Sequence, residues 1–406
     1  MKDTKIEKLI RAEERRQRET IDLIASENFV SKDVSVALGS VFTNKYAEGY
    51  PGRRYYAGVL NADALELETQ RRALELFGLS PKKWSVNIQP LSGSPANLAI
   101  YLALVPKGGR MMGMRLDAGG HLTHGFAGSI SGKFWDWKHY VLNSKTELLD
   151  YTEIMRTAKK WQPKLIVAGG SAYSRVIDWD VFRRIANGVG AILMIDLSHY
   201  AGLVAGRAYP SPFPYADVVM TTTHKTLRGP RGAMIFVKNE YAKAINRAIF
   251  PGVQGGPHLN QIAALGIALH EAGTPEFKKY AKQVVKNAHM LAKEIQKRGW
   301  RIVSGGTDSH LFTVDVGARG VRGNDAEKLL ERAGMIVNRE EIPNDTGGSR
   351  DPSGIRIGTP AVTTRGMKEK EMKTIAAWFD SILTKRNDAG IQKAAKNLCK
   401  RFILKN

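Results

Sequence analysis

Two short apolar segments, each ending in polar residues, constrain the fold of this chain more than any other feature. Residues 191–195 lead directly into Asp196, and residues 216–220 lead into three threonines, His224 and Lys225. Segments of this length and composition are typical of buried strands. A carboxylate at the carboxyl end of a parallel strand points into the crevice where α/β folds bind ligands. The pair therefore predicts a ligand site at one edge of a parallel sheet.

The segment around Lys225 indicates which chemistry this site would perform. Threonine hydroxyls precede the lysine and Arg228 and Arg231 follow it, which suits a phosphate-bearing partner. A lysine in this position can form a Schiff base with an aldehyde, and pyridoxal phosphate (PLP) is the aldehyde cofactor that enzymes hold in this way. Asp196 would keep a pyridine nitrogen protonated, and His199 could reach the phenolic oxygen. The alternatives are a solvated surface turn for the lysine segment and a helix N-cap for Asp196.

Glycine-rich segments supply further candidates for phosphate binding. Ser92, Gly93 and Ser94 precede a helical pattern over residues 98–104, which predicts N–H groups and hydroxyls at a helix N-terminus. The same three residues would also make an ordinary helix cap. His121 could stack on an aromatic cofactor. Residues 250–257 form another loop whose bare backbone is consistent with close approach to a phosphate.

Taken in order along the chain, these blocks resemble a known family, serine hydroxymethyltransferase. The resemblance extends from about Ile21 to about Leu383 and is most specific in residues 23–28, 43–56, 119–125, 171–174, 221–232, 250–257, 303–308 and 354–360. It implies a PLP-dependent transferase fold of fold type I (aspartate-aminotransferase-like), which is α/β, with a largely parallel sheet between helices and a smaller C-terminal α+β domain. It also implies an enzyme, glycine hydroxymethyltransferase, that reversibly converts serine and a tetrahydropterin to glycine and the 5,10-methylene-tetrahydropterin.

The resemblance implies a role for individual residues. Lys225 would hold PLP, Asp196 would pair with the pyridine nitrogen, and His121 would stack on the ring. Glu48 would be the acid–base group of the one-carbon transfer, with Tyr55 close to it. The other implied cofactor contacts are Ser92, Gly93, Ser94, Ser171, His199, Thr222, Tyr46, Gly255 and Gly256. The implied substrate contacts are Ser26, Glu48, Tyr56 and Arg356, and the implied pterin contacts are Leu116, Gly120, Leu122, Tyr55 and Asn344.

Two segments depart from the family pattern. Residues 344–352 occupy the region where bacterial members carry a Ser-Pro-Phe segment that contacts folate, and residues 116–119 differ from the usual Leu-Ala-His-Gly. Tetrahydrofolate is therefore the default one-carbon carrier, and a modified tetrahydropterin stays open. A pterin-independent aldolase acting on threonine-like β-hydroxy amino acids is the alternative enzyme. A basic RNA-binding protein that kept the fold is the alternative from another class.

Length and composition bound the remaining expectations. The chain has 406 residues and a net charge of +22, which leaves a nucleic-acid partner open. We expect an N-terminal helical arm over residues 1–35, a large PLP-binding domain over 36–272, and a small domain with a basic tail over 273–406. The single cysteine, Cys399, excludes an intrachain disulfide and favours a cytoplasmic location. We expect no metal site and no membrane span, and the resemblance implies a homodimer with shared active sites, with a tetramer left open.

The hydrophobic pattern also predicts individual elements. We expect helices over residues 5–18, 61–77, 179–186 and 276–298, and strands over 165–168, 191–195, 218–221, 233–237, 300–303 and 310–315. The apolar positions of the second helix are Leu65, Leu67, Leu74 and Leu76. Near the C-terminus, Ile391, Ala394, Ala395 and Leu398 form the inner stripe of an amphipathic helix.

Overall fold

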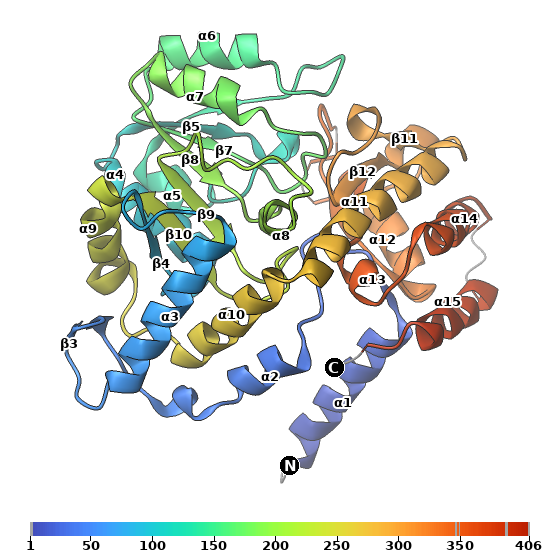
Figure 1. Ribbon diagram of the computed structural model, residues 1–406. Helices are drawn as coiled ribbons and strands as arrows, with labels where there is room; N and C mark the ends of the chain where they lie inside the picture. Colours follow the sequence, from blue (N-terminus) through green and yellow to red (C-terminus); the bar gives the residue numbers. More distant parts are fainter. Residues whose placement is uncertain (1–2, 346, 349, 386–388, 405–406) are drawn as a thin grey trace. The chain divides into compact units, whose positions relative to one another are not determined.

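The computed structural model describes residues 3–345, 347–348, 350–385 and 389–404, and it divides into two compact units (Figure 1). The larger unit contains residues 30–282, and the smaller contains residues 1–29 and 283–406. Residues 1–29 of the expected N-terminal arm therefore belong to the same unit as the C-terminal region, whereas residues 30–35 belong to the larger unit. Helix α10 (Leu259–Ala272) ends and α11 (Pro275–Gln296) begins near the expected domain boundary, but the division between the units lies within α11. Some residues of two segments discussed above lie outside the described residues. They are Thr346 and Ser349 of segment 344–352, and Arg386, Asp388 and Lys405 of the basic tail.

A seven-stranded sheet forms the centre of the larger unit. Its strand order is β4 (Trp84–Asn87), β10 (Ala233–Lys238), β9 (Val218–Thr222), β8 (Ile192–Asp196), β7 (Leu165–Ala168), β5 (Arg110–Met114) and β6 (Asp136–Tyr140). Strand β10 is antiparallel to both of its neighbours, and the other neighbouring pairs are parallel. The expected α/β fold with a largely parallel sheet is confirmed.

Helices cover both faces of this sheet, which explains why its central strands are apolar on both sides. On one face, α4 (Gly93–Leu104) and α9 (Asn239–Arg247) share a buried core with alternate residues of β7, β9 and β10. Strands β7 and β8 also contact α7 (Trp179–Asn187), which packs beside α6 (Tyr151–Trp161) in the layer at the top of Figure 1. The remaining elements of this unit are α2 (Lys32–Leu38), β2 (Gly49–Tyr50), β3 (Arg53–Arg54), α3 (Leu60–Leu76), α5 (Ile130–Phe134) and α8 (Ala201–Ala205).

The buried face of α3 consists of small side chains and one glutamate. Its buried residues are Ala62, Glu66, Thr69 and Ala73, whereas Leu67 is 54% exposed. Small side chains let α3 approach α10 closely, since a Cβ at Gly266 would lie 2.9 Å from Thr69 Oγ1. The apolar positions Leu65, Leu74 and Leu76 are partly buried, and hydrophobicity alone does not anticipate the glutamate that is buried in an ion pair.

The smaller unit is built on an antiparallel sheet with the strand order β11 (Arg301–Ile302), β12 (Leu311–Asp315), β15 (Gly354–Gly358) and β14 (Asn338–Glu340). Strand β1 (Ile21–Asp22) pairs in parallel with β13 (Met335–Ile336). Side chains from α11, α12 (Gly323–Arg332), α14 (Glu369–Lys385) and α15 (Ala389–Arg401) complete one apolar core with these strands. Helix α13 (Pro360–Thr364) follows β15. The expected smaller α+β domain is thus present.

One buried arginine joins the ends of the first and last helices. Arg365 donates to the carbonyls of Gln17 (2.8 Å) and Arg18 (2.9 Å) at the end of α1 (Thr4–Glu19). It also donates to the carbonyls of Cys399 (3.0 Å) and Phe402 (3.1 Å) at the end of α15. The last carbonyls of a helix lack intrahelical partners and carry partial negative charge, so one guanidinium stabilises both ends.

Helix α15 also buries much of its expected inner stripe. Ala395 and Leu398 are buried with Cys399, and Ile391 is partly buried against the same core. Ala394 is only half-buried. The basic residues Lys393, Lys400 and Arg401 are exposed, so they lie on the side of α15 away from its buried stripe.

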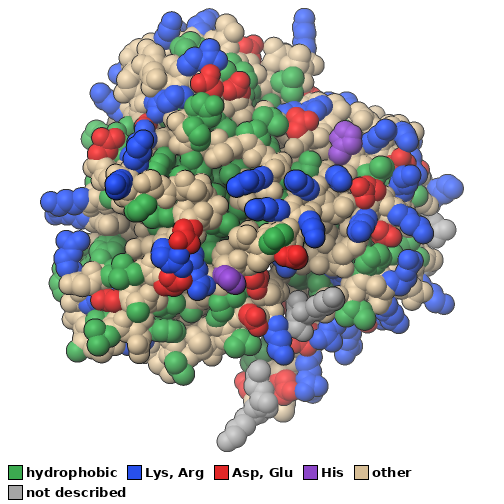
Figure 2. All heavy atoms as spheres, viewed as in Figure 1, with side chains coloured by type: hydrophobic (Ala, Val, Ile, Leu, Met, Phe, Trp, Pro, Cys, Tyr) green, Lys and Arg blue, Asp and Glu red, His purple; other side chains and the backbone are tan. Residues whose placement is uncertain are grey.

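Figure 2 shows Lys and Arg side chains distributed across the visible face rather than gathered in one patch. Within the described residues, no helix has both the length and the apolar character needed to cross a bilayer. In the same part of the chain, no group of three or more His, Cys, Asp and Glu side chains has a metal-binding arrangement.

We expect Arg365→Met to lower the free energy of unfolding by about 2–3 kcal/mol, because charge-assisted hydrogen bonds to the ends of both helices are lost. Urea denaturation followed by circular dichroism measures this difference. Lys396→Met is the matched control, since Lys396 forms a half-exposed ion pair with Glu19 (2.8 Å) between the same helices. Its loss should cost at most about 1 kcal/mol. Equal losses in the two variants would contradict the role assigned to Arg365.

Candidate active site

The carboxyl ends of five strands bring the predicted cofactor residues to one edge of the large sheet. Strands β4, β5, β7, β8 and β9 run in the same direction, because β4 and β9 are both antiparallel to β10. Ser92 and Gly93 follow β4, Ser171 follows β7, and Lys225 follows β9. Parallel strands end at a common edge, which is where open α/β sheets bind ligands.

Asp196, the last residue of β8, is the central charge at this edge. Its Oδ2 accepts hydrogen bonds from Asn97 Nδ2 and His124 Nε2, both at 3.1 Å, and its Oδ1 accepts one from the Ser198 N–H at 3.1 Å. Burial alone would raise the pKa of this carboxyl, but the hydrogen bonds that it accepts from His124 and Ser198 hold its pKa below the usual range. Asp196 is therefore an ionised carboxylate within the protein.

The hydrogen bonds around His124 determine which of its nitrogens donates to Asp196. The His121 backbone N–H donates to His124 Nδ1 at 3.2 Å, so this nitrogen is the acceptor and Nε2 carries the proton. The His121 ring is held in turn by Thr123, whose Oγ1 lies 2.7 Å from His121 Nδ1. Asn97 Nδ2 donates to the same Thr123 hydroxyl at 2.8 Å. One hydrogen-bonded chain thus orients the predicted stacking residue His121 and the carboxylate together.

Sequence reasoning identified Asp196 and His121 but not Asn97, Thr123 or His124. Asn97 lies one turn into α4, and Thr123 and His124 lie in the segment already singled out for His121. Asn97 and His124 are 99 and 72 residues from Asp196 in sequence, so only the fold reveals the contacts. A polar side chain inside the otherwise apolar α4 was the available signal for Asn97.

Lys225 is held at the end of β9 beside Asp196. Its Nζ donates to Thr222 Oγ1 at 2.8 Å, and the Thr222 N–H donates to Ser198 Oγ at 3.2 Å. The turn is fixed to the previous strand by Thr226, whose Oγ1 donates to the carbonyl of the buried His199 at 3.0 Å. Hydrogen bonds therefore join the segment that contains Lys225 to the turn that follows Asp196.

The histidine that precedes the lysine is kept neutral. Burial, with smaller contributions from the charges of Lys225 and Arg231, lowers the pKa of His224 to about 3. Its buried Nδ1 has no hydrogen-bond partner among the described residues. At neutral pH this imidazole thus adds no positive charge beside Lys225.

The N-terminus of α4 fits a phosphate. The helix begins at Gly93, its N-cap Ser92 makes no side-chain capping bond, and its first turn contains no acidic residue. A Cβ at Gly93 would lie 2.8 Å from Thr222 Cγ2, so only glycine allows this close approach of helix and strand. The first N–H groups of a helix lack intrahelical partners and favour an anion. Together with a lysine, an ionised aspartate and an imidazole, this terminus supplies the donor set that PLP requires.

The turn after β5 contains the predicted pterin residues Leu116, Gly120 and Leu122. Leu116 begins a short 3₁₀ turn over Leu116–Ala118, and Leu122 is 49% exposed. A side chain at Gly120 would collide with the carbonyl of Met114, the last residue of β5. The Ser171 N–H donates to the Gly119 carbonyl at 2.6 Å, which joins this turn to the one after β7. The structure thus brings Ser171 and the residues from 116 to 122 to adjoining turns.

A second cluster gathers the residues expected to act across a dimer. Tyr46 Oη donates to Glu48 Oε1 at 3.3 Å, and the rings of Tyr46 and Tyr56 lie 5.0 Å apart. A Cβ at Gly255 would lie 3.1 Å from Glu48 Oε1, and one at Gly256 would lie 3.2 Å from the Tyr46 ring. The neighbouring Tyr55 packs on Phe250, with ring centroids 5.6 Å apart. Tyr46 and Tyr55 are 51% and 76% exposed.

A buried arginine fixes the backbone on both sides of Glu48. Arg54 Nη1 donates to the carbonyls of Ala47 (3.0 Å) and Gly49 (2.8 Å). Its other nitrogens form ion pairs with Glu66 (2.6 Å) and Asp63 (2.8 Å) of α3. This network is the reason that α3 buries a glutamate, and it was not anticipated from the sequence.

Arg356 lies in the smaller unit, on β15. Its Nε donates to Asn338 Oδ1 at 3.1 Å and lies 3.5 Å from Glu340 Oε2, both on the adjacent strand β14. Burial raises the pKa of Glu340, while the charge of Arg356 opposes this shift. The end of β15 lies against the segment that contains the half-buried Ser26, because the Gly358 N–H donates to the Leu23 carbonyl at 2.7 Å.

Asn344 belongs to the loop between β14 and β15. It has a positive φ of 63°, and the loop is folded back by the neighbouring Asp345, which accepts hydrogen bonds from the Gly347 and Ser353 N–H groups. Ser26, Arg356 and Asn344 thus lie in one unit, and the cofactor residues lie in the other.

Sequence comparisons with known proteins identify the family to which this chain belongs. The family model for serine hydroxymethyltransferase matches residues 1–379. The chain is 50% identical to a serine hydroxymethyltransferase of Koribacter versatilis over 406 residues, covering 99% of this chain and 94% of that protein. It is 52% identical to the serine hydroxymethyltransferase of Acidobacterium capsulatum over 92% of this chain and 86% of that protein. With the serine hydroxymethyltransferase of Desulfotalea psychrophila it shares 50% identity over 98% of this chain and 94% of that protein. This chain belongs to the serine hydroxymethyltransferase family.

Proposed function

We propose that this protein reversibly converts serine and tetrahydrofolate to glycine and 5,10-methylene-tetrahydrofolate, with PLP as its cofactor. The observation that best supports the proposal is the edge of the large sheet, where an ionised Asp196 and the amine of Lys225 lie at the ends of adjacent parallel strands. Membership of the family supplies the reaction type.

The residues at the sheet edge would bind the cofactor in three ways. Lys225 would hold it through its amine, and the N-terminus of α4 would bind its phosphate. Asp196 would keep its ring nitrogen protonated, and it can do so because neighbouring donors hold the carboxylate ionised. When bound, PLP supplies an electron sink for the pair released as the serine Cα–Cβ bond breaks.

The substrate would be bound and deprotonated by residues outside this edge. Arg356 would bind the amino-acid carboxylate, for which its planar guanidinium is suited. Glu48 would move the protons of the one-carbon transfer, with Tyr46 holding its carboxylate by the 3.3 Å hydrogen bond. Ser26 and Tyr56 would complete the substrate site, and Tyr55, Leu116, Gly120, Leu122 and Asn344 would line the pterin site.

The proposal includes a homodimer with shared active sites. Large apolar side chains are exposed along residues 36–67, namely Val36, Val41, Tyr46, Tyr55, Leu60 and Leu67. An exposed apolar surface of this kind commonly marks a protein interface. The same stretch contains Glu48, so a partner that covers it would receive the cluster around this carboxylate. A cytoplasmic location is in keeping with the single, buried thiol of Cys399.

The first test measures cleavage of serine to glycine with tetrahydrofolate, with a methanopterin analogue, and without a pterin. We expect turnover to depend on tetrahydrofolate and to be abolished by Lys225→Ala, because the amine that holds the cofactor is lost. Lys238→Ala is the control. Lys238 is the last residue of β10, which is antiparallel to β9, so it lies at the edge of the sheet opposite Lys225, where it pairs with Asp217. Borohydride reduction and peptide mapping should find the pyridoxyl group on Lys225. Pterin-independent cleavage would favour the aldolase, and a label on another lysine would refute the assignment of Lys225.

The second test asks whether Glu48 serves the partner's site. Mixing inactive Lys225→Ala protein with inactive Glu48→Gln protein should restore about a quarter of wild-type activity. With free subunit exchange about half of the dimers are hybrids, and each hybrid has one site with both residues intact. Turnover after exchange is the readout, and native mass spectrometry confirms the hybrids. If confirmed hybrids stay inactive, Glu48 acts within its own subunit.

The third test concerns the backbone that carries Glu48. Arg54→Leu should lower kcat by about tenfold or more, because a misplaced acid–base group loses much of its contribution. Spectroscopic titration should show nearly unchanged PLP affinity. Arg53→Leu, a change at the exposed neighbour on the same strand, should leave kcat close to wild type. Rescue of kcat by Arg54→Lys would show that charge alone suffices and would contradict the need for the two carbonyl contacts.

A further inference from the structure

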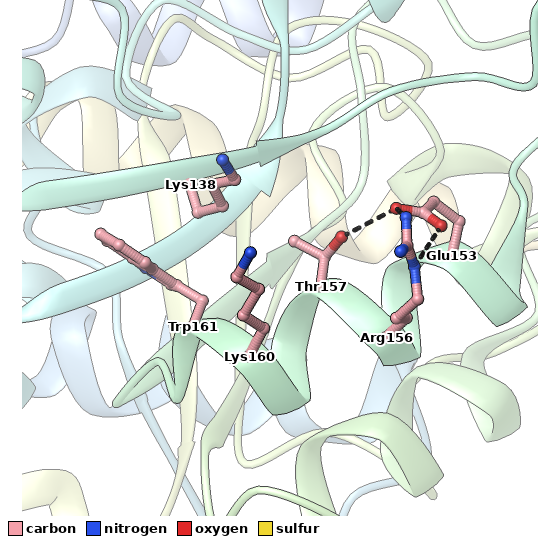
Figure 3. Close-up of a pocket in the computed structure, with 6 residues that line it drawn as sticks. All are labelled: Lys138, Glu153, Arg156, Thr157, Lys160 and Trp161. Atoms are coloured by element: carbon pink, nitrogen blue, oxygen red, sulfur yellow. Dashed lines mark hydrogen bonds and ion pairs between the residues drawn. The ribbon is translucent and has the colours of Figure 1, made fainter.

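A basic hollow lies at the far edge of the large sheet. It has a volume of about 330 Å³ and is lined by Lys138 of the edge strand β6 and by Glu153, Arg156, Thr157, Lys160 and Trp161 of α6 (Figure 3). The helix residues recur at intervals of three or four, so they share one face of α6. Strand β6 pairs only with β5 and ends the sheet, away from the strand ends that hold Lys225.

The charges around this hollow do not balance. The single acid, Glu153, is already engaged by Arg156 at 2.8 Å and by the Thr157 hydroxyl at 3.3 Å. Lys138 and Lys160 form no hydrogen bond or ion pair with any described residue, and Figure 3 shows both extending beside the Trp161 ring. The C-terminal dipole of α6 accounts for a lysine at position 160 but not for one contributed by a separate strand. Two ammonium groups directed to one hollow provide a binding site for an anion.

Trp161 gives the hollow an aromatic wall. Its indole N–H donates to the Met111 carbonyl at 3.1 Å, which fixes the plane of the ring. The guanidinium of Arg110 lies 5.9 Å from the ring centroid and adds a further positive charge nearby. With the N–H already used, the ring can offer a ligand only its π surface and edge.

We propose that this hollow binds a nucleoside phosphate, with the phosphate between Lys138 and Lys160 and the base against Trp161. A phosphate matches two ammonium groups that line one hollow, and a nucleobase matches a fixed aromatic ring. The volume falls within the range of about 300–1,000 Å³ that is usual for small-molecule sites. The ligand is a free nucleotide or the phosphorylated end of a single-stranded RNA, and both present the same chemistry.

Isothermal titration of the PLP-loaded protein tests the proposal with four probes: AMP, adenosine, inorganic phosphate, and a 5′-phosphorylated oligoadenylate. We expect saturable binding of AMP that is tighter than that of adenosine or phosphate, because only AMP engages both lysines and the ring. An oligoadenylate that binds more tightly than AMP identifies RNA as the source, and equal or weaker binding identifies the free nucleotide. Absence of saturable AMP binding, or phosphate binding as tight as that of AMP, would overturn the proposal.

Two pairs of variants separate the site from general surface charge. Lys138→Gln/Lys160→Gln should weaken AMP binding by about tenfold or more, since two charge-assisted contacts are lost. Lys159→Gln/Lys164→Gln removes the same charge from exposed neighbours that do not line the hollow and should leave AMP affinity unchanged.

Trp161→Leu should weaken binding by about fivefold or more, whereas Trp161→Phe keeps an aromatic ring and should retain most of the affinity. Serine turnover should remain normal in all four, which shows that they are folded. Equal losses in the two lysine pairs would contradict a defined site.

Discussion

The ionised carboxylate of Asp196 is the interaction on which the larger unit's functional edge depends. A carboxylate removed from water is stable only if donors replace its hydration, and otherwise it becomes protonated. Here the donors come from three places in the chain: Asn97 in α4, His124 after β5, and the Ser198 N–H after β8. Each must be positioned to within a few tenths of an ångström. Maintaining this one charge therefore fixes the helix and both turns relative to the strand end.

The direction of the strands makes this convergence possible. Strand β10 lies between β4 and β9 and is antiparallel to both. Strands β4 and β9 therefore run in the same direction. The helix that follows β4 therefore begins at the same edge as Lys225. The two meet so closely that Gly93 has no room for a Cβ beside Thr222. A helix N-terminus, which favours anions, and an amine thus lie at the same edge because of sheet topology and one glycine.

The sequence predicted the parts of the structure that depend on local pattern. The strands expected over residues 165–168 and 218–221 were recognisable because both are fully buried and begin with apolar residues. Asn97 and His124 were missed because their partner Asp196 lies 99 and 72 residues away in sequence. Thr123 was missed because its role depends on Asn97 in another element as well as on the neighbouring His121. The burial of Glu66 on α3 was not anticipated for a related reason, since its partners Arg54 and Gln89 lie outside the helix. Family resemblance supplied candidate residues, and only the fold reveals the hydrogen bonds among them.

Three buried charged side chains, Arg54, Arg365 and Asp196, are compensated by the groups around them. Arg54 and Arg365 are surrounded by carboxylates or carbonyls, and Asp196 is surrounded by donors. Lys138 and Lys160, by contrast, are exposed, and they line a hollow whose single lining acid, Glu153, is already paired. Since both lysines are exposed, water compensates for this arrangement at little cost to stability. An anion that enters the hollow gains attraction from both without breaking an existing ion pair, so the unbalanced charge favours binding rather than folding.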